Sequence, residues 1–227
     1  MNNFWVTTEG AWGDGSVHLT TIGSIVVVLV IAALLITAAI LRQRHAAKKT
    51  VLTTRQLVFS AAAIALAVVC SMIKLFEMPM GGSVTLLSML FIVLIAYWYG
   101  PSVGLMTAVA YGLVQFVMEP IFYTLPQMLL DYPLAFGALG LAGFFNKKKF
   151  GLQIGYLIGV LGRFLLATLS GLIFFASYAP EGMHPLVYSL GYNASYLLPE
   201  AIVTLLLISI QPVAKALARV KAQAVEE

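Results

Sequence analysis

The chain has 227 residues, of which 61% are hydrophobic and only 10% are charged, and its mean hydropathy is +0.96. These values exclude an ordinary soluble domain and indicate one integral membrane domain. The formal net charge of +4 does not indicate nucleic-acid binding, because most of the basic residues lie in three short segments that flank apolar runs.

Seven apolar segments are candidates to span a membrane, which requires a helix of about 20 residues. The first has its basic residues after the apolar core, which favours an anchor helix over a cleaved signal peptide. Between the third and fourth, Tyr99-Gly100-Pro101 predicts a tight helical hairpin, because glycine ends helices and proline begins them. The predicted helices are 21–41, 54–75, 84–99, 101–118, 127–145, 153–177 and 186–212.

The distribution of basic residues predicts the orientation, because cytoplasmic loops of membrane proteins are enriched in lysine and arginine. Seven spans place all three basic segments on one side and three glutamate-containing connections on the other. We therefore expect the N-terminus outside, the C-terminus in the cytoplasm, and the basic segments near anionic lipid head groups. The basic segments are 42–55, 147–149 and 215–221, and the acidic connections are 76–83, 119–126 and 178–185.

The three connections on the expected outer side contain unusual residues. In "EMPMGGSV", Gly81 and Gly82 allow close backbone approach, and Ser83 is expected to cap the next helix. The connection "MEPIFYTLPQ" is bounded by prolines and ends at Gln127, and "SYAPEGMHP" contains Tyr178. These residues are candidates for the entrance of a binding site.

Asp131 lies in the apolar run "QMLLDYPLAFGALGLAG". An ionisable group inside a membrane costs several kcal/mol unless it is paired or faces a cavity. Asp131 is about one turn from the expected outer edge of its span, so we expect it to line a pocket that is reached from outside. An internal ion pair with Arg163 is the alternative at this point.

Aromatic and amide side chains accompany this acid at a similar depth. Rings such as Phe175 and Tyr188, an amide such as Asn193 and one carboxylate suit a flat, cationic, nitrogen-rich ligand. Tyr188 and Asn193 point about 140° apart on a helix, so both line one pocket only if it wraps around that helix. Tyr178 and Tyr188 could equally belong to an interfacial aromatic belt. Glu200, directly after Pro199, favours a structural role.

Catalytic and ATP-binding motifs are absent from the sequence. There is no G-x-x-x-x-G-K-[ST] loop, no H-E-x-x-H motif, and no serine or cysteine with a nearby base in the apolar segments. We therefore expect neither an enzyme nor a bound cofactor or metal.

Four stretches, "GGSV", "LLDYPLAF", "GRFLLATLSGLIFFASYAPEG" and "YSLGYNASYLLPE", resemble the thiamine-specific S components of energy-coupling-factor transporters over about residues 54–212. The resemblance implies an all-α integral protein of the bacterial cell membrane, with a six-helix bundle that binds thiamine with high affinity. The implied partners are a transmembrane coupling protein and two ATPase subunits. The expected division is 1–53, with an extra N-terminal transmembrane helix; 54–214, the six-helix domain; and 215–227, a cytoplasmic tail.

Carried over by position, the family's ligand-binding residues fall on Asp131, Tyr132, Phe175, Tyr188 and Asn193. The family often has glutamate at the position of Asp131 and histidine at that of Ala167, so a thiamine precursor or a related pyrimidine stays open as the ligand. Further candidate binding residues are Gly82, Ser83, Gln127, Arg163 and Tyr178.

Small residues in "SAAAIALAVV" predict a helix-packing surface on segment 54–75. In the family such an alanine stripe contacts the coupling protein, which makes Ala61 and Ala65 candidate partner-binding residues. Packing within the bundle is the alternative. A proton-coupled secondary carrier, with Asp131 and Glu200 as relay acids, is the second functional hypothesis, although no inverted repeat supports it.

Overall fold

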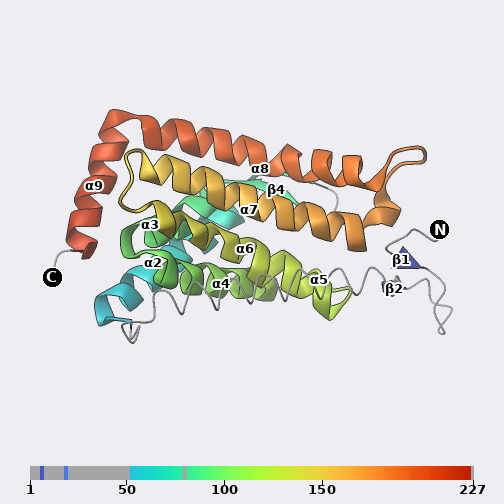
Figure 1. The fold of residues 1–227 in the computed structure, drawn as a ribbon, viewed down its shortest axis with the longest axis horizontal. Coiled ribbons are helices and arrows are strands. Elements are labelled where there is room, and N and C mark those ends of the chain that lie inside the picture. The colour runs from blue at the N-terminus through green and yellow to red at the C-terminus, as the bar shows by residue number, and fades with distance from the viewer. Residues whose placement is uncertain (1–5, 8–17, 20–51, 79–80, 226–227) are drawn as a thin grey trace.

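The computed structural model describes residues 6–7, 18–19, 52–78 and 81–225 of the chain. Five helical segments in this part are long and apolar enough to cross a membrane, and a shorter apolar helix accompanies them. Figure 1 shows the long helices side by side along one axis. The predicted membrane bundle is thus confirmed, whereas the predicted helix 21–41 lies outside the described residues. The five segments are Thr54–Met72, Pro101–Met118, Leu125–Phe145, Gly151–Phe174 and Pro185–Ser209.

Helix α2 (Thr54–Met72) begins at a capping box. The Thr53 hydroxyl accepts a hydrogen bond from Gln56 N at 3.2 Å, and Gln56 Oε1 accepts one from Thr53 N at 3.1 Å. These bonds satisfy N–H groups that a helix N-terminus leaves unpaired. The helix therefore starts at the predicted residue.

The junction of α3 (Ser88–Tyr99) and α4 (Pro101–Met118) is the predicted helical hairpin. Gly100 has a φ of 89°, a left-handed value that glycine adopts without strain, and Pro101 is the first residue of α4. The two helices consequently pack directly against each other.

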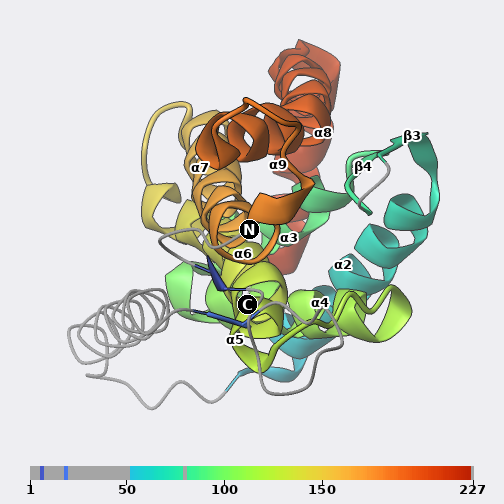
Figure 2. The same ribbon diagram turned by 90° about the vertical axis from the view of Figure 1, so that its right-hand side faces the viewer.

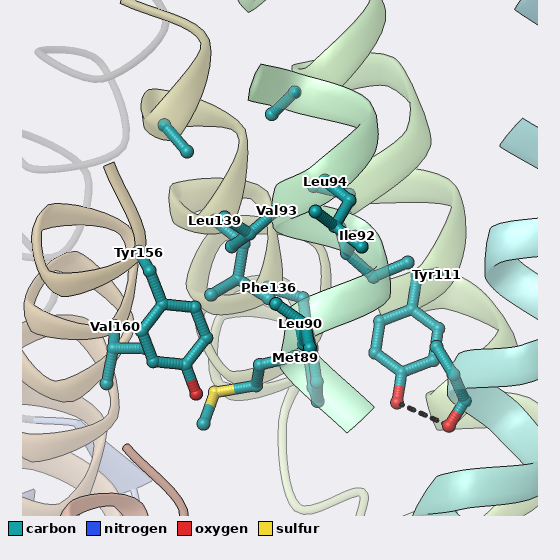
Figure 3. Packing of buried hydrophobic residues seen from close by; sticks show 14 of the residues in the cluster. Met89, Leu90, Ile92, Val93, Leu94, Tyr111, Phe136, Leu139, Tyr156 and Val160 are labelled. Carbon is teal, nitrogen blue, oxygen red and sulfur yellow. Dashed lines mark hydrogen bonds between the residues drawn. The ribbon is translucent and has the colours of Figure 1, made fainter. Parts of the chain in front are cut away.

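Helix α3 lies at the centre of the bundle. Every residue from Ser88 to Ala96 except Phe91 is buried, as expected of a helix that is apolar on all sides. In Figure 3, Tyr111 of α4 and Tyr156 of α7 (Gly151–Phe174) lie on opposite sides of residues from this helix. The main core cluster therefore joins α3 to its neighbours on both sides.

A β-hairpin follows α2 where the sequence predicted the end of one helix and the start of the next. Strand β3 (Lys74–Glu77) pairs antiparallel with β4 (Ser83–Thr85). Strand β4 contacts both α2 and α8 (Pro185–Ser209), and Figure 2 shows the hairpin beside α2. The predicted helix 84–99 is therefore wrong at its start.

A second short antiparallel pair joins strand β1 (Val6–Thr7) to strand β2 (His18–Leu19).

The predicted role of Ser83 as a helix cap is also wrong. Ser83 pairs with Glu77 in the hairpin, and α3 begins five residues later, after Leu87 with a φ of 63°. The apolar side chain of Leu87 cannot accept a hydrogen bond. The unpaired N–H groups at the start of α3 therefore need an acceptor from another part of the chain.

Glu200 of α8 supplies that partner. Its carboxylate accepts hydrogen bonds from Thr85 Oγ1 at 2.7 Å, Ser88 Oγ at 3.2 Å and Met89 N at 3.2 Å. The side chain is buried, and a carboxylate at a helix N-terminus is favoured by the helix dipole. Glu200 thus has a structural contact: its side chain joins α8 to the start of α3.

Replacing Glu200 with alanine is expected to destabilise the ligand-free protein, because two hydroxyls and one N–H lose a common acceptor. Leaving buried polar groups unpaired costs roughly 2 kcal/mol, which lowers the melting temperature by about 5 °C. Thermal unfolding in detergent measures this, with Glu181→Ala in an exposed loop as the control. Equal melting temperatures for the two variants would contradict the capping role.

The segment from Leu125 to Phe145 is an irregular helix. It passes through α5 (Leu125–Leu129), the π-helical η1 (Leu130–Leu134), α6 (Ala135–Gly137) and the 3₁₀-helical η2 (Ala138–Phe145). Pro133 lies inside η1 and donates no backbone hydrogen bond, which interrupts a regular α-helix. Helix α7 follows, and then the 3₁₀ turn η3 (Ala176–Tyr178).

Helix α9 (Gln211–Val225) turns sharply away from α8, as Figure 1 shows. It folds back on α2 and α3: Tyr99 Oη donates to Ala224 O at 2.8 Å, and Lys221 Nζ lies 4.1 Å from the ring centroid of Tyr97. The expected boundary between residues 214 and 215 therefore falls inside a helix.

Candidate ligand-binding site

A cavity of about 480 Å³ lies between the β3–β4 hairpin and helices α2, α4, α7 and α8, with the irregular segment 125–145 as another wall. This volume is in the range of small-molecule sites. Nine of the ten predicted ligand-binding residues line it, and Gln127 does not. The nine are Gly82, Ser83, Asp131, Tyr132, Arg163, Phe175, Tyr178, Tyr188 and Asn193.

The π turn explains why two consecutive residues, Asp131 and Tyr132, both line this cavity. A π turn has more residues per turn than an α-helix, so neighbouring side chains diverge less, and such turns are frequent at functional sites. The Tyr132 hydroxyl donates to Glu119 O at 2.7 Å and accepts from Ile121 N at 2.9 Å. Tyr132 therefore also fixes the loop that follows α4.

The Asp131 carboxylate is held by an uncharged group. Its Oδ2 accepts a hydrogen bond from Gln127 Nε2 at 2.7 Å. Among the described residues, no ion pair within 4 Å joins Asp131 to Arg163, whose guanidinium lies 4.0 Å from the ring centroid of Phe136. The geometry thus favours a pocket acid over the internal ion pair.

One wall of the cavity is aromatic. The Phe175 ring lies 6.1 Å from the Tyr178 ring at a shallow angle of 30°, and Tyr123 meets Phe175 edge-on at 5.3 Å. The Tyr123 and Tyr178 hydroxyls are 3.0 Å apart, within hydrogen-bonding distance. Tyr123 does not line the cavity itself and packs against the Phe175 ring.

Helix α8 contributes three tyrosines spaced four residues apart, Tyr188, Tyr192 and Tyr196, and Asn193 between them. The Asn193 amide donates to Ser189 O at 2.9 Å, and its Oδ1 accepts from Tyr196 Oη at 2.6 Å. Tyr188 and Asn193 point about 140° apart on this helix, and both line the cavity, so the cavity wraps around part of the helix.

Gly82 brings the β3–β4 hairpin onto this row of tyrosines. Its backbone N donates to Tyr192 Oη at 3.0 Å, and a β-carbon at this position would lie 2.7 Å from the Tyr196 ring. Only glycine permits this approach without a shift of the ring.

Three charged residues that the sequence analysis did not assign to the site also line the cavity. Lys74 Nζ forms an ion pair with Glu77 at 3.0 Å within β3, and a second with Glu119 at 2.7 Å that joins β3 to the end of α4. The hydrogen bonds with Glu119 and then Glu77 raise the pKa of Lys74. Glu119 is distant in sequence from Lys74 and Glu77, and nothing local in the sequence indicates that these segments meet.

Other lining residues have a recognisable spacing in the sequence. Tyr111 and Gln115 form an i, i+4 polar pair within the apolar helix α4, and Gln115 Nε2 donates to Tyr111 Oη at 2.5 Å. Tyr196 continues the four-residue spacing of Tyr188 and Tyr192. In residues 52–78 and 81–225, no three His, Cys, Asp or Glu side chains form a possible metal site.

Comparisons with known proteins identify related chains. The family model described as "Thiamine transporter protein" matches residues 57–219. The thiamine transporter ThiT of Bacillus subtilis is 38% identical over 160 residues, which are 64% of this chain and 82% of that protein. ThiT of Lacticaseibacillus paracasei is 29% identical over 97 residues, 37% of this chain and 48% of that protein.

A solved structure of ThiT from Listeria monocytogenes has a similar fold. The TM-score is 0.60 at 22% sequence identity, and the match covers 69% of this chain and 94% of the other. The likeness therefore extends over nearly the whole of that helical membrane protein.

Proposed function

Because the chain belongs to the thiamine transporter protein family, we propose that it is a high-affinity S component that captures thiamine outside the cell and delivers it through an ATP-driven energy-coupling-factor complex. The observation that carries this proposal is the cavity, which is lined both by an acid with no counter-ion within 4 Å among the described residues and by aromatic rings.

The charges of the cavity suit a ligand with one positive charge. Lys74 and Arg163 contribute two positive charges to its lining, and Glu77, Glu119 and Asp131 contribute three negative ones. The formal balance is 2 − 3 = −1, the opposite of the single charge of a thiazolium ring. Two of the carboxylates are occupied by Lys74, so Asp131 is the one available to the ligand.

The aromatic walls suit the two flat rings of thiamine. A cation over an aromatic face is attracted by the ring quadrupole, and an aminopyrimidine stacks on tyrosine or phenylalanine. Asp131 can accept a hydrogen bond from the amino group, in addition to balancing the positive charge. Ala167 lines the cavity without a polar group, so a thiamine precursor remains the alternative ligand.

The secondary-carrier hypothesis has less support. It needs Asp131 and Glu200 as relay acids, yet Glu200 does not line the cavity and is occupied by three donors at the start of α3. An S component instead leaves ATP hydrolysis to partner subunits, which fits a sequence with no phosphate-binding loop.

We place the N-terminus outside and the C-terminus in the cytoplasm. The cavity is then at the outer side, because Glu77, Glu119 and the loop before α8 belong to the acidic connections. The lysines at 147–149 and those of α9 lie on the cytoplasmic side, as the positive-inside rule expects.

The test is calorimetric titration of the detergent-purified chain with thiamine, its free aminopyrimidine moiety and choline. We expect saturable, one-to-one binding of thiamine, weaker binding of the uncharged pyrimidine, and none of choline. Absence of saturable thiamine binding would refute the proposed function, whereas tighter binding of the pyrimidine alone would identify a precursor transporter.

Phe175→Ala is expected to weaken thiamine binding about fivefold, because a cation–aromatic contact contributes roughly 0.5–2 kcal/mol. Phe175→Trp should preserve or tighten binding, since indole is the best cation–π partner. Titration and ligand-free melting temperature are measured for both variants. A packing role predicts that alanine and tryptophan both lower the melting temperature and that tryptophan does not improve binding.

A further inference from the structure

Gln127 differs from the other predicted binding residues, because its side chain is completely buried and yet does not line the cavity. The amide is engaged at both ends. Its Nε2 donates to Asp131 Oδ2 at 2.7 Å and to Ile121 O at 3.2 Å, and its Oε1 accepts from Tyr123 N at 3.0 Å. One side chain therefore joins the cavity acid to the loop before α5.

The start of α5 fixes the position of this side chain. Thr124 is the N-cap, and its hydroxyl accepts a hydrogen bond from Gln127 N at 3.3 Å. In a capping box the glutamine would bind the backbone N–H of the cap itself. Here it binds Tyr123 N, one residue earlier, while its Nε2 reaches Asp131 one turn further along the helix.

The loop held by Gln127 supports the aromatic wall. The Tyr123 ring meets Phe175 at 5.3 Å with an interplanar angle of 89°, and its hydroxyl lies 3.0 Å from that of Tyr178. The acid and the stacking ring, which belong to different helices, are thus connected through Gln127 and Tyr123.

We propose that Gln127 is a positioning residue that holds the Asp131 carboxylate in the cavity wall and ties it to the Tyr123 loop. This inference rests on the proposed function. An amide suits the role because it donates to a carboxylate without cancelling its charge, whereas lysine or arginine would neutralise it. Arg163, the charged group of α7 near Asp131, lies over the Phe136 ring, and among the described residues it forms no ion pair within 4 Å with Asp131, so this carboxylate stays available to the ligand.

Gln127→Glu is the sharpest variant, because it keeps an acceptor for Tyr123 N and removes the amide N–H donors to Asp131 and Ile121 O. We expect thiamine affinity to fall about tenfold, since a hydrogen bond to a charged group is lost and a second carboxylate is introduced. Gln127→Met, which removes all the polar contacts at similar volume, should weaken binding as well. The matched control is Gln153→Glu near the start of α7, at the end of that helix away from the cavity.

The double variant Gln127→Glu/Asp131→Asn exchanges donor and acceptor. It should restore the hydrogen bond between positions 127 and 131, and with it part of the ligand-free melting temperature, although the bond to Ile121 O stays lost. It should not restore thiamine affinity, because the charge has moved out of the cavity wall. Melting temperature and calorimetric affinity are measured for all variants in the full chain.

Two results would overturn the proposal: wild-type affinity in both Gln127→Glu and Gln127→Met, or recovery of affinity in the exchanged pair. The first shows that Gln127 does not act on the site, and the second shows that it serves only to pack the helix. Loss of thiamine binding in the wild-type chain itself would instead refute the proposed function, and this inference with it.

Discussion

Asp131→Asn is expected to weaken thiamine binding by at least tenfold. The substitution keeps the shape of the side chain but removes its negative charge. The amide introduced at position 131 then turns either its oxygen, an acceptor, or its nitrogen, a donor, toward Gln127 Nε2. Charge-assisted contacts contribute about 1.5–3 kcal/mol, which corresponds to a factor of ten or more in affinity. Calorimetric titration of the purified protein measures the change.

Glu181→Gln is the matched control, since this carboxylate lies in an exposed loop and does not line the cavity. Its affinity should equal that of the wild-type chain. Asp131→Glu should retain most of the affinity, because the charge is kept and the family often has glutamate there. An Asp131→Asn variant that binds thiamine as tightly as the wild type would assign Asp131 a structural role.

The helices were predictable from the sequence wherever the signal is local. Apolar length marks the spans, and Gly100-Pro101 marks the hairpin between α3 and α4, because backbone restrictions of these two residues act without help from the rest of the fold. Asp131 was recognised for a similar reason: a carboxylate in an apolar run needs an explanation whatever surrounds it.

The hairpin and the short α3 could not be predicted in this way. Residues 83–87 have the hydropathy of a membrane-spanning segment, yet they are not helical. Strand β4 pairs with β3, and Glu200, more than 110 residues later, caps the helix that starts at Ser88. At twelve residues, α3 is only about 18 Å long, shorter than the hydrocarbon core of a bilayer. Tertiary contacts therefore decide where this helix starts.

The candidate site shows the same division. Phe175 and Asn193 were selected from their residue types and their depth in the apolar segments, and the resemblance pointed to the same residues. The ion pair between Lys74 and Glu119 depends on the approach of two distant segments. Gln127 was predicted to bind the ligand directly, whereas its side chain contacts Asp131 and does not line the cavity. Residue type indicates chemistry, and the fold decides whether that chemistry faces the ligand.

Helix α2 presents two alanine stripes that the sequence did not separate. Ala63 and Ala67 are buried against the bundle, which is the packing role weighed as an alternative, whereas Ala61 and Ala65 are exposed on the other side of the helix. Exposed small residues four apart let a second helix approach closely. This surface is where we propose that the coupling protein docks.

Ala61→Trp and Ala65→Trp are each expected to abolish thiamine uptake while leaving thiamine affinity and melting temperature close to those of the wild type. The indole adds bulk to the exposed stripe, so it blocks helix approach, and neither alanine lines the cavity or packs inside the bundle. Uptake of labelled thiamine is measured with the complete transporter in proteoliposomes, and binding is measured on the isolated chain. Leu165→Trp, on an exposed position of α7, controls for bulk elsewhere on the apolar surface. Normal uptake by both alanine variants would show that the partner docks elsewhere, and reduced melting temperatures would show that the stripe is part of the packed bundle.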